Sequence, residues 1–138
     1  MQEHHRTMVS RAAYGKLTGF ILGLLGLVII IYTLPNLGWA IRFGTLFYSI
    51  NLGLLVGILS VDIKHPVFPI EFKWWLMGPM MGAWFNFTLM LFIGDAYEKI
   101  LNQSETFLSY FSSPLWMVLD GAICGLIISL VVHRMVKE

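Results

Sequence analysis

The segment from Trp74 to Gly94 contains 21 consecutive residues without a charged side chain. An α-helix rises about 1.5 Å per residue, so a helix of this length matches the hydrocarbon thickness of a bilayer. Lys73 and two tryptophans stand at one end, and Asp95 and Tyr97 follow the other. Such residues are typical of the headgroup level. The segment therefore predicts a membrane-spanning helix.

The composition of the whole chain agrees with a membrane location. Of the 138 residues, 57% are hydrophobic and 12% are charged, whereas a soluble domain averages about 25% charged residues. The net charge of +1 gives no reason to expect nucleic acid as a partner. Cys124 is the single cysteine, so an intramolecular disulfide is excluded, and we interpret this thiol as a small hydrophobic side chain.

Three further apolar segments have the length of a span. The expected spans cover residues 17–34, 39–61, 74–94 and 114–132 of a single membrane domain, 1–138. The turn signal Pro35-Asn36-Leu37-Gly38 is so short that the first two spans must be antiparallel. We therefore expect an all-α integral membrane protein with four transmembrane helices arranged as two antiparallel hairpins.

Two longer connections separate these spans. In residues 62–73, Pro66 and Pro69 exclude a regular helix, and interleaved apolar and charged residues predict a loop along the membrane surface. In residues 95–113, Asn102 and Glu105 have the spacing of a capping box, and aromatic residues follow. This pattern predicts a short interfacial helix in that connection.

The distribution of lysine and arginine predicts the orientation in the membrane. Cytoplasmic segments are enriched in these residues. Seven of them lie in the N-terminal segment, the middle loop and the C-terminal tail, against two on the other side: Arg6, Arg11, Lys16, Lys64, Lys73, Arg134 and Lys137, against Arg42 and Lys99. Both termini and the middle loop are therefore expected in the cytoplasm. We expect a bacterial inner membrane, with an organelle membrane as the alternative.

Small residues recur four apart in every predicted span, which places them on one helix face and predicts close helix packing. The main packing positions are Gly19, Gly23, Gly53, Gly57, Gly78, Gly82, Gly121 and Gly125; Gly15 extends the first ridge, and Gly26 follows it three residues after Gly23. Four helices in one chain should not bury all these ridges, so we expect further partners. The segment from Asn51 to Ser60 also resembles that from Asp120 to Ser129, with Gly53 and Gly57 aligned with Gly121 and Gly125. This similarity indicates either a parallel internal repeat or the general abundance of small residues in membrane helices.

Four polar side chains lie inside the expected spans: Arg42, Asn51, Asn86 and Asp120. A charge at the centre of a span costs about 2.5–3.5 kcal/mol on insertion scales. The two charged residues, Arg42 and Asp120, therefore need a structural or functional explanation. Arg42 and Asp120 lie at similar depths, which predicts an ion pair between them. Alternatively, Arg42 reaches the headgroups alone, and Asp120 faces a cavity or serves as a proton or ion site.

The two asparagines lie near the middle of their spans. Asn51 points away from the glycine face of its helix, which indicates neighbours on two sides. A hydrogen bond between Asn51 and Asn86 would join two hairpins or two protomers. The other interpretation is a polar lining for a solute path, with the hydroxyl groups of Thr45, Ser49 and Thr88.

Catalytic and metal-binding patterns give no support to an enzyme. His4, His5, His65 and His133 all lie outside the middle of the spans, so haem ligation across the bilayer is not expected. No spacing of histidine, cysteine and carboxylates fits a metal site, and no serine stands beside a base. We expect no cofactor and no catalytic residue.

One family comparison is relevant to transport. Gly44-Thr45-Leu46, Asn51, Gly53 and Gly57, together with Phe85 and Phe87, resemble the small four-span fluoride channels. The resemblance would imply a path lined by an asparagine and a phenylalanine pair. The glycines after Asn51 do not have the spacing found in that family. The family's first-span motif, which is rich in glycine and arginine, is missing from this chain. The assignment is therefore not carried over to this chain.

These observations predict a small polytopic membrane protein, in contact with lipids and with other membrane subunits or copies of itself. The first hypothesis is a non-catalytic accessory or scaffolding subunit of a larger complex. The alternative is a small oligomeric ion or solute channel or transporter. An intramembrane enzyme based on Asp120 is a third hypothesis with less support.

Overall fold

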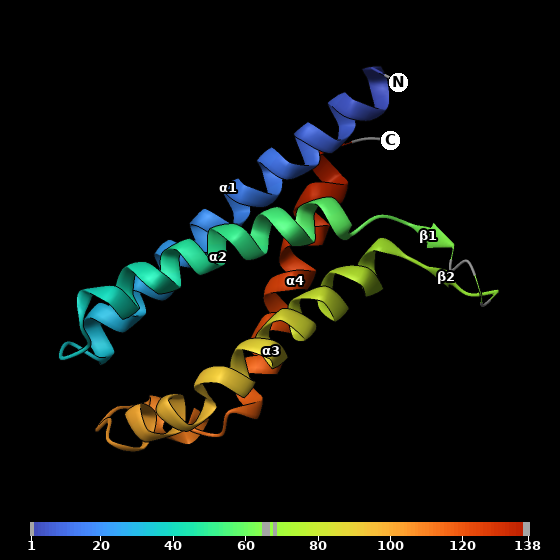
Figure 1. Cartoon of the computed structure of the whole chain (residues 1–138). Helices are drawn as coiled ribbons and strands as arrows, with labels where there is room; N and C mark the ends of the chain where they lie inside the picture. The colour runs from blue at the N-terminus through green and yellow to red at the C-terminus, as the bar shows by residue number, and fades with distance from the viewer. Residues whose placement is uncertain (1, 65–66, 68, 137–138) are drawn as a thin grey trace.

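The computed structural model describes residues 2–64, 67 and 69–136, and in this part the chain is all-α apart from two very short strands. Four helices are long and apolar enough to cross a membrane (Figure 1). They are α1 (Gln2–Thr33), α2 (Trp39–Leu59), α3 (Trp74–Asn102) and α4 (Leu115–Met135). The predicted class, an all-α protein with four transmembrane helices, is confirmed. His65, Pro66 and Lys137, which entered the predictions, lie outside the described residues.

Two helices extend well beyond the expected spans. α1 already begins at Gln2, because no proline or glycine interrupts the polar segment before Gly15. α3 continues past Gly94 to Asn102, so Asn102 ends a helix and does not cap one. The capping-box interpretation of Asn102 and Glu105 is therefore wrong. The 3-10 helix η1 (Phe107–Phe111) follows in this connection, and its location at the bilayer surface stays a prediction.

Helices α1 and α2 pack through their small residues. A Cβ atom added at Gly15 would meet the Gly53 carbonyl oxygen and the Gly57 Cα within 3.0 Å. One added at Gly19 would meet the Ser49 carbonyl oxygen and the Gly53 Cα at comparable distances. Later residues of α1 therefore face earlier residues of α2, so the two helices run antiparallel (Figure 1). Side chains at these glycines would force the backbones apart.

Helices α3 and α4 repeat this arrangement. An added Cβ at Gly78 would collide with Ser129 and the Gly125 carbonyl oxygen, and one at Gly82 with the Gly121 carbonyl oxygen and the Gly125 Cα. Each ridge is thus covered by its hairpin partner. The argument that these ridges need partners outside the chain is therefore wrong, because α1 covers α2 and α3 covers α4.

The matching contacts define equivalent positions in the two hairpins. Gly53 contacts Gly15 and Gly19, while Gly125 makes the same contacts with Gly78 and Gly82, so Gly53 corresponds to Gly125. The sequence comparison had aligned Gly53 with Gly121, one helical turn away. A ridge of small residues every fourth position matches itself equally well after a shift of four, which is why sequence alone gave the wrong register.

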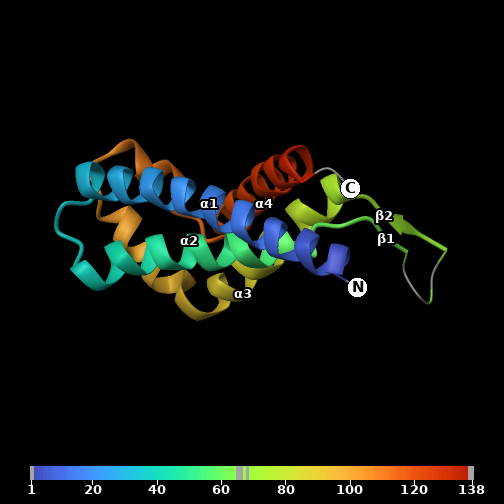
Figure 2. The ribbon, with the colours of Figure 1, turned by 90° about the horizontal axis from the view of Figure 1, so that it is seen from above.

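The hairpins meet through a small apolar core. Leu52 and Val56 of α2 pack with Ile128 and Val132 of α4 and with Val136. Figures 1 and 2 both place the two termini and the β1–β2 loop toward one end of the molecule, which we call the termini end. At the opposite end, a cavity of about 650 Å³ lies between the hairpin tips, lined by residues 33–37, 100 and 103–106.

The middle loop contains a short antiparallel ladder that the sequence did not indicate. Strands β1 (Ile63–Lys64) and β2 (Glu71–Phe72) pair with Ile63 opposite Phe72 and Lys64 opposite Glu71. Two-residue strands are too short for an alternating pattern to identify them. The expected location of this loop along the membrane surface stays a prediction.

Candidate functional site

Arg11 is buried, with 2% of its surface exposed, although it lies in the polar N-terminal segment. Its Nε donates a hydrogen bond to the Gly57 carbonyl oxygen at 3.2 Å, and a terminal nitrogen donates to the Ser60 carbonyl oxygen. Both acceptors lie at the C-terminal end of α2, where the last carbonyls have no partner within the helix. The guanidinium therefore caps α2, and its charge complements the helix dipole.

The sequence analysis counted Arg11 only as a basic residue flanking a span. A usable signal was present, because Arg11 stands four residues before Gly15 and so continues the face of Gly15, Gly19 and Gly23. Extending that face backwards would have placed the guanidinium against α2. The helix had been expected to start only at residue 17, and this hid the relation.

A chain of hydrogen bonds links three helices inside the bundle. The Tyr48 hydroxyl of α2 donates to the Asn86 side-chain oxygen of α3 at 2.6 Å. The Asn86 amide nitrogen in turn donates to the Met117 carbonyl oxygen of α4 at 2.7 Å. Asn86 is 5% exposed; its bond to Met117 is buried, and its bond to the half-buried Tyr48 is partly buried. This network joins the two hairpins as well as the two helices of the second hairpin.

Asp120 lies beside this network on α4. It stands five residues after Leu115, which corresponds to a depth of about 7.5 Å along the helix axis. The Cys124 thiol contacts its Oδ1 at 3.9 Å, and the next residue, Gly121, packs against Asn86. The residue is nevertheless exposed in the isolated chain.

The predicted ion pair between Arg42 and Asp120 is not made. Arg42 donates a hydrogen bond to the Pro35 carbonyl oxygen at 2.5 Å, and its guanidinium lies 5.4 Å from the centre of the Trp39 ring. These contacts turn it toward the end of its own hairpin. Among the described residues, Asp120 forms no ion pair. Equal depth in the membrane was therefore not sufficient to predict an ion pair, because the two side chains belong to different hairpins and face different neighbours.

The predicted hydrogen bond between Asn51 and Asn86 is also absent, since Asn86 uses its amide on Tyr48 and Met117. Asn51 is exposed, and its side chain has no hydrogen-bond partner among the described residues. The three hydroxyls considered as a polar lining each donate to the carbonyl four residues earlier in their own helix: Thr45, Ser49 and Thr88. Within this chain, each of these hydroxyl groups therefore has a hydrogen-bond acceptor in its own helix.

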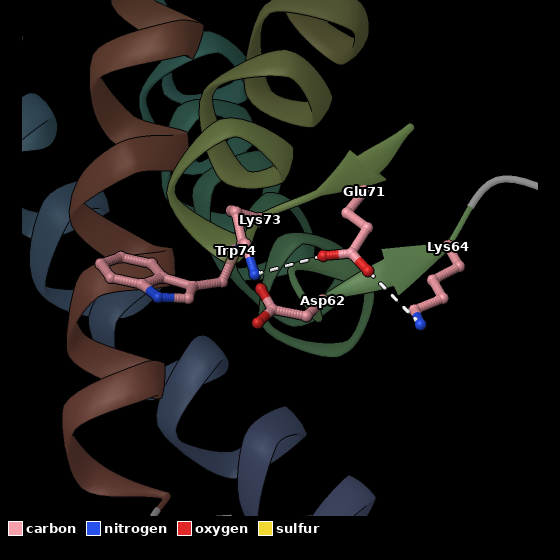
Figure 3. A network of polar contacts seen from close by, with 5 residues as sticks. All are labelled: Asp62, Lys64, Glu71, Lys73 and Trp74. Atoms are coloured by element: carbon pink, nitrogen blue, oxygen red, sulfur yellow. Dashed lines mark hydrogen bonds and ion pairs between the residues drawn. The ribbon is translucent and has the colours of Figure 1, made fainter. Parts of the chain in front are cut away.

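A charged cluster surrounds the start of α3 at the termini end (Figure 3). The Trp74 backbone N–H donates to the Asp62 carboxylate at 2.7 Å, which caps the helix with an acidic group. Glu71 lies 3.4 Å from Lys64 and 3.6 Å from Lys73. All of these charged side chains are exposed, so their ion pairs contribute little to global stability.

The Trp74 ring stacks on His133 of α4, with ring centres 4.3 Å apart and planes 12° from parallel. Trp74 thereby joins α3 to α4 at the termini end, as Arg11 joins α1 to α2. By the register derived above, Trp74 occupies the place on α3 that Arg11 occupies on α1, since each stands four residues before the first glycine of its ridge.

Comparison with protein-family models, with curated proteins and with solved structures finds no match for this chain. Within the described residues, no group of three or more histidine, cysteine, aspartate or glutamate side chains could hold a metal ion. The arrangement found is a polytopic membrane protein with an internal hydrogen-bond network, in which Asn51 and Asp120 are exposed on α2 and α4.

Proposed function

We propose that this chain is a non-catalytic accessory or scaffolding subunit of a larger membrane complex. The observation that supports the proposal is Asp120, an exposed carboxyl group in the outer part of a span. Its described neighbours offer it a weak thiol contact and no cation. A carboxylate facing hydrocarbon is costly, so such groups pair or line a polar path.

The partner would be a transmembrane segment that carries a basic or hydrogen-bond-donating side chain at the same depth. Arg42 does not supply that group within the chain, because it is engaged at the end of α2. The tightly packed hairpins would give such a segment a preformed surface. The glycine ridges do not support this proposal, since the helices of this chain already cover them.

The proposal is tested by the composition of the particle that the chain forms with Asp120 changed. Asp120→Leu should release a co-purifying polypeptide, and Asp120→Asn should weaken its retention by removing the charge. Leu119→Ala, at an exposed apolar neighbour, is the matched control and should retain the partner. If the same polypeptides co-purify with Asp120→Leu and with the control, Asp120 is not the contact.

The second candidate function is a small oligomeric channel or transporter. It is favoured by the cavity between the hairpin tips, lined partly by Asn36, Gln103 and Glu105, and by the Tyr48–Asn86 network between the hairpins. Flux through vesicles that contain only this chain would support it. Flux should then fall in Asn86→Leu and Asp120→Asn. An absence of flux for every small ion and solute tried would remove this candidate.

For either function we propose an orientation with both termini and the β1–β2 loop in the cytoplasm, at a bacterial inner membrane. The support is the excess of lysine and arginine in these segments. Figure 1 groups the termini and the loop at one end of the helices, as this orientation requires.

A further inference from the structure

Asn51 is the polar group that the fold leaves without an explanation. It stands 12 residues after Trp39 and eight before Leu59, near the middle of α2. Its amide offers two donors and an acceptor, and it has no partner among the described residues. Inside hydrocarbon such a group is normally satisfied by another protein group.

The surroundings of Asn51 form a continuous face of α2. At 100° per residue, five other residues of α2 lie within about 40° of Asn51 around the helix. We call this set the outward face of α2: Ala40, Gly44, Phe47, Asn51, Leu55 and Ile58. Ser49 and Gly53, which pack on α1, lie on the opposite side, so the hairpin leaves the outward face uncovered.

Gly44 on this face is a second feature without an internal explanation. Among the glycines of the described helices, it is the one whose added Cβ would meet no atom within 4 Å. Glycine weakens a helix, and the glycines of the four-residue ridges are compensated by close contact with the partner helix of their hairpin. Gly44 stands seven residues before Asn51, two turns along the same face, where it would let another helix approach closely.

The chemistry of the face fits a copy of itself. A carboxamide is self-complementary, because its N–H₂ group donates to the oxygen of an identical group. Two copies with the same orientation, related by a two-fold axis along the membrane normal, place residues of equal depth opposite each other. Asn51 would then meet Asn51, and Gly44 would meet Gly44. The steps of three and four residues along the face match a helix-pairing seam, in which one asparagine fixes the register.

We propose that the outward face of α2 binds the same face of a second copy of this chain, with the Asn51 amides hydrogen-bonded to each other. The proposal goes beyond the accessory function, since it concerns contact between copies and does not involve Asp120. A dimer built in this way leaves both Asp120 side chains on α4 for another partner.

The test is oxidative cross-linking in membranes that contain the full-length chain at low expression. Cys124→Ser removes the native thiol and keeps a hydrogen-bonding group beside Asp120. In this background, Leu55→Cys on the outward face should form a disulfide-linked dimer of the chain. Ile123→Cys is the matched control, because it occupies the position on α4 that corresponds to Asn51 and is 52% exposed. It should remain monomeric.

The second part of the test determines whether Asn51 stabilises the proposed dimer. Adding Asn51→Leu to the Leu55→Cys chain should lower the association constant about tenfold, the size expected for an interhelical hydrogen bond of model peptides. Gly44→Ile should also lower it, by keeping the helices apart, whereas Asn51→Gln should retain most of the dimer. The midpoint of thermal unfolding checks that each variant is folded; if Asn51→Leu is not folded, the Gly44→Ile result decides.

Three results would overturn the proposal. They are equal cross-linking of Leu55→Cys and Ile123→Cys, cross-linking of Leu55→Cys only to a different polypeptide, and unchanged dimer yield in Asn51→Leu and Gly44→Ile. A dimer that persists when Asp120→Leu has no effect on composition would count against the accessory function alone. The two proposals therefore fail separately.

Discussion

At the scale of single residues, the burial of Arg11 is the least expected feature of the molecule. Its guanidinium reaches from α1 to the carbonyl oxygens of Gly57 and Ser60 and satisfies the end of α2. The contact joins residues 46 and 49 positions apart in sequence. Arg11 therefore stabilises the hairpin as well as one helix end.

The first prediction concerns this cap. Arg11→Met keeps much of the side-chain volume but leaves the two carbonyls without their charged donor, and a hydrogen bond to a charged group contributes about 1.5–3 kcal/mol. We expect the free energy of unfolding in detergent to fall by about 2–3 kcal/mol. Arg134→Met, at an exposed arginine, is the control and should change it by less than about 0.5 kcal/mol. Equal stabilities of the two variants would show that the cap is unimportant.

The second prediction measures the Tyr48–Asn86 bond by a double-mutant cycle of Tyr48→Phe and Asn86→Leu. Interhelical hydrogen bonds in membrane proteins average about 0.6 kcal/mol and reach about 1.7 kcal/mol. We expect a coupling energy in this range, from unfolding of the four proteins of the cycle. Tyr32→Phe, at an exposed tyrosine, should show no coupling to Asn86→Leu. Additive effects of Tyr48→Phe and Asn86→Leu would contradict the bond.

Sequence reasoning identified the polar residues of the spans but assigned the wrong partners. Arg42, Asn51, Asn86 and Asp120 stand out because charges and amides are rare in hydrocarbon. Their partners depend on how each helix is rotated and on which hairpin faces which. Tyr48 was missed as the partner of Asn86, because a tyrosine in a span is usually interpreted as an apolar residue with a polar tip.

At the scale of the helices, close backbone contact defines both hairpins. Four-residue spacing of glycines correctly marked the faces on which helices meet. What the spacing could not supply was the partner of each ridge or the register between ridges, because every ridge fits every other. The chain resolves this ambiguity by pairing neighbours in sequence, α1 with α2 and α3 with α4.

The third prediction compares two glycines on one helix. Gly19→Ala places a Cβ within 3.0 Å of α2 backbone atoms, and overpacking of this kind costs about 1–3 kcal/mol. Gly26→Ala meets only the Thr45 Cγ2 at 3.6 Å, an ordinary contact, so it should be neutral or stabilising by up to about 1 kcal/mol. Thermal unfolding in detergent should separate the two variants. A Gly19→Ala protein as stable as Gly26→Ala would contradict the packing.

At the scale of the whole molecule, hydropathy was sufficient for the class of fold, because four apolar segments of span length leave few alternatives. Helix ends were less predictable. Polar residues continue α1 and α3 beyond the apolar segments, and hydropathy detects only the part of a helix that hydrocarbon would surround. The cavity between the hairpin tips was not foreseen, since it depends on the angle between hairpins.

The fourth prediction concerns orientation. In the Cys124→Ser background, Ile70→Cys and Met135→Cys should react with a membrane-impermeant maleimide from one side of sealed vesicles. Asn36→Cys and Gln103→Cys should react only from the other side. All four positions are exposed. The reason is the even number of spans and the concentration of basic residues at the termini end. Labelling of Ile70→Cys and Asn36→Cys from the same side would contradict four spans.

The most direct test of the central claim, that the chain is a subunit of a larger assembly, is the native mass of the gently extracted particle. We predict a particle that contains this chain together with at least one other polypeptide. That other polypeptide should be lost from the Asp120→Leu particle. A particle made only of this chain, with the same mass for wild type and Asp120→Leu, would contradict the claim and favour the channel.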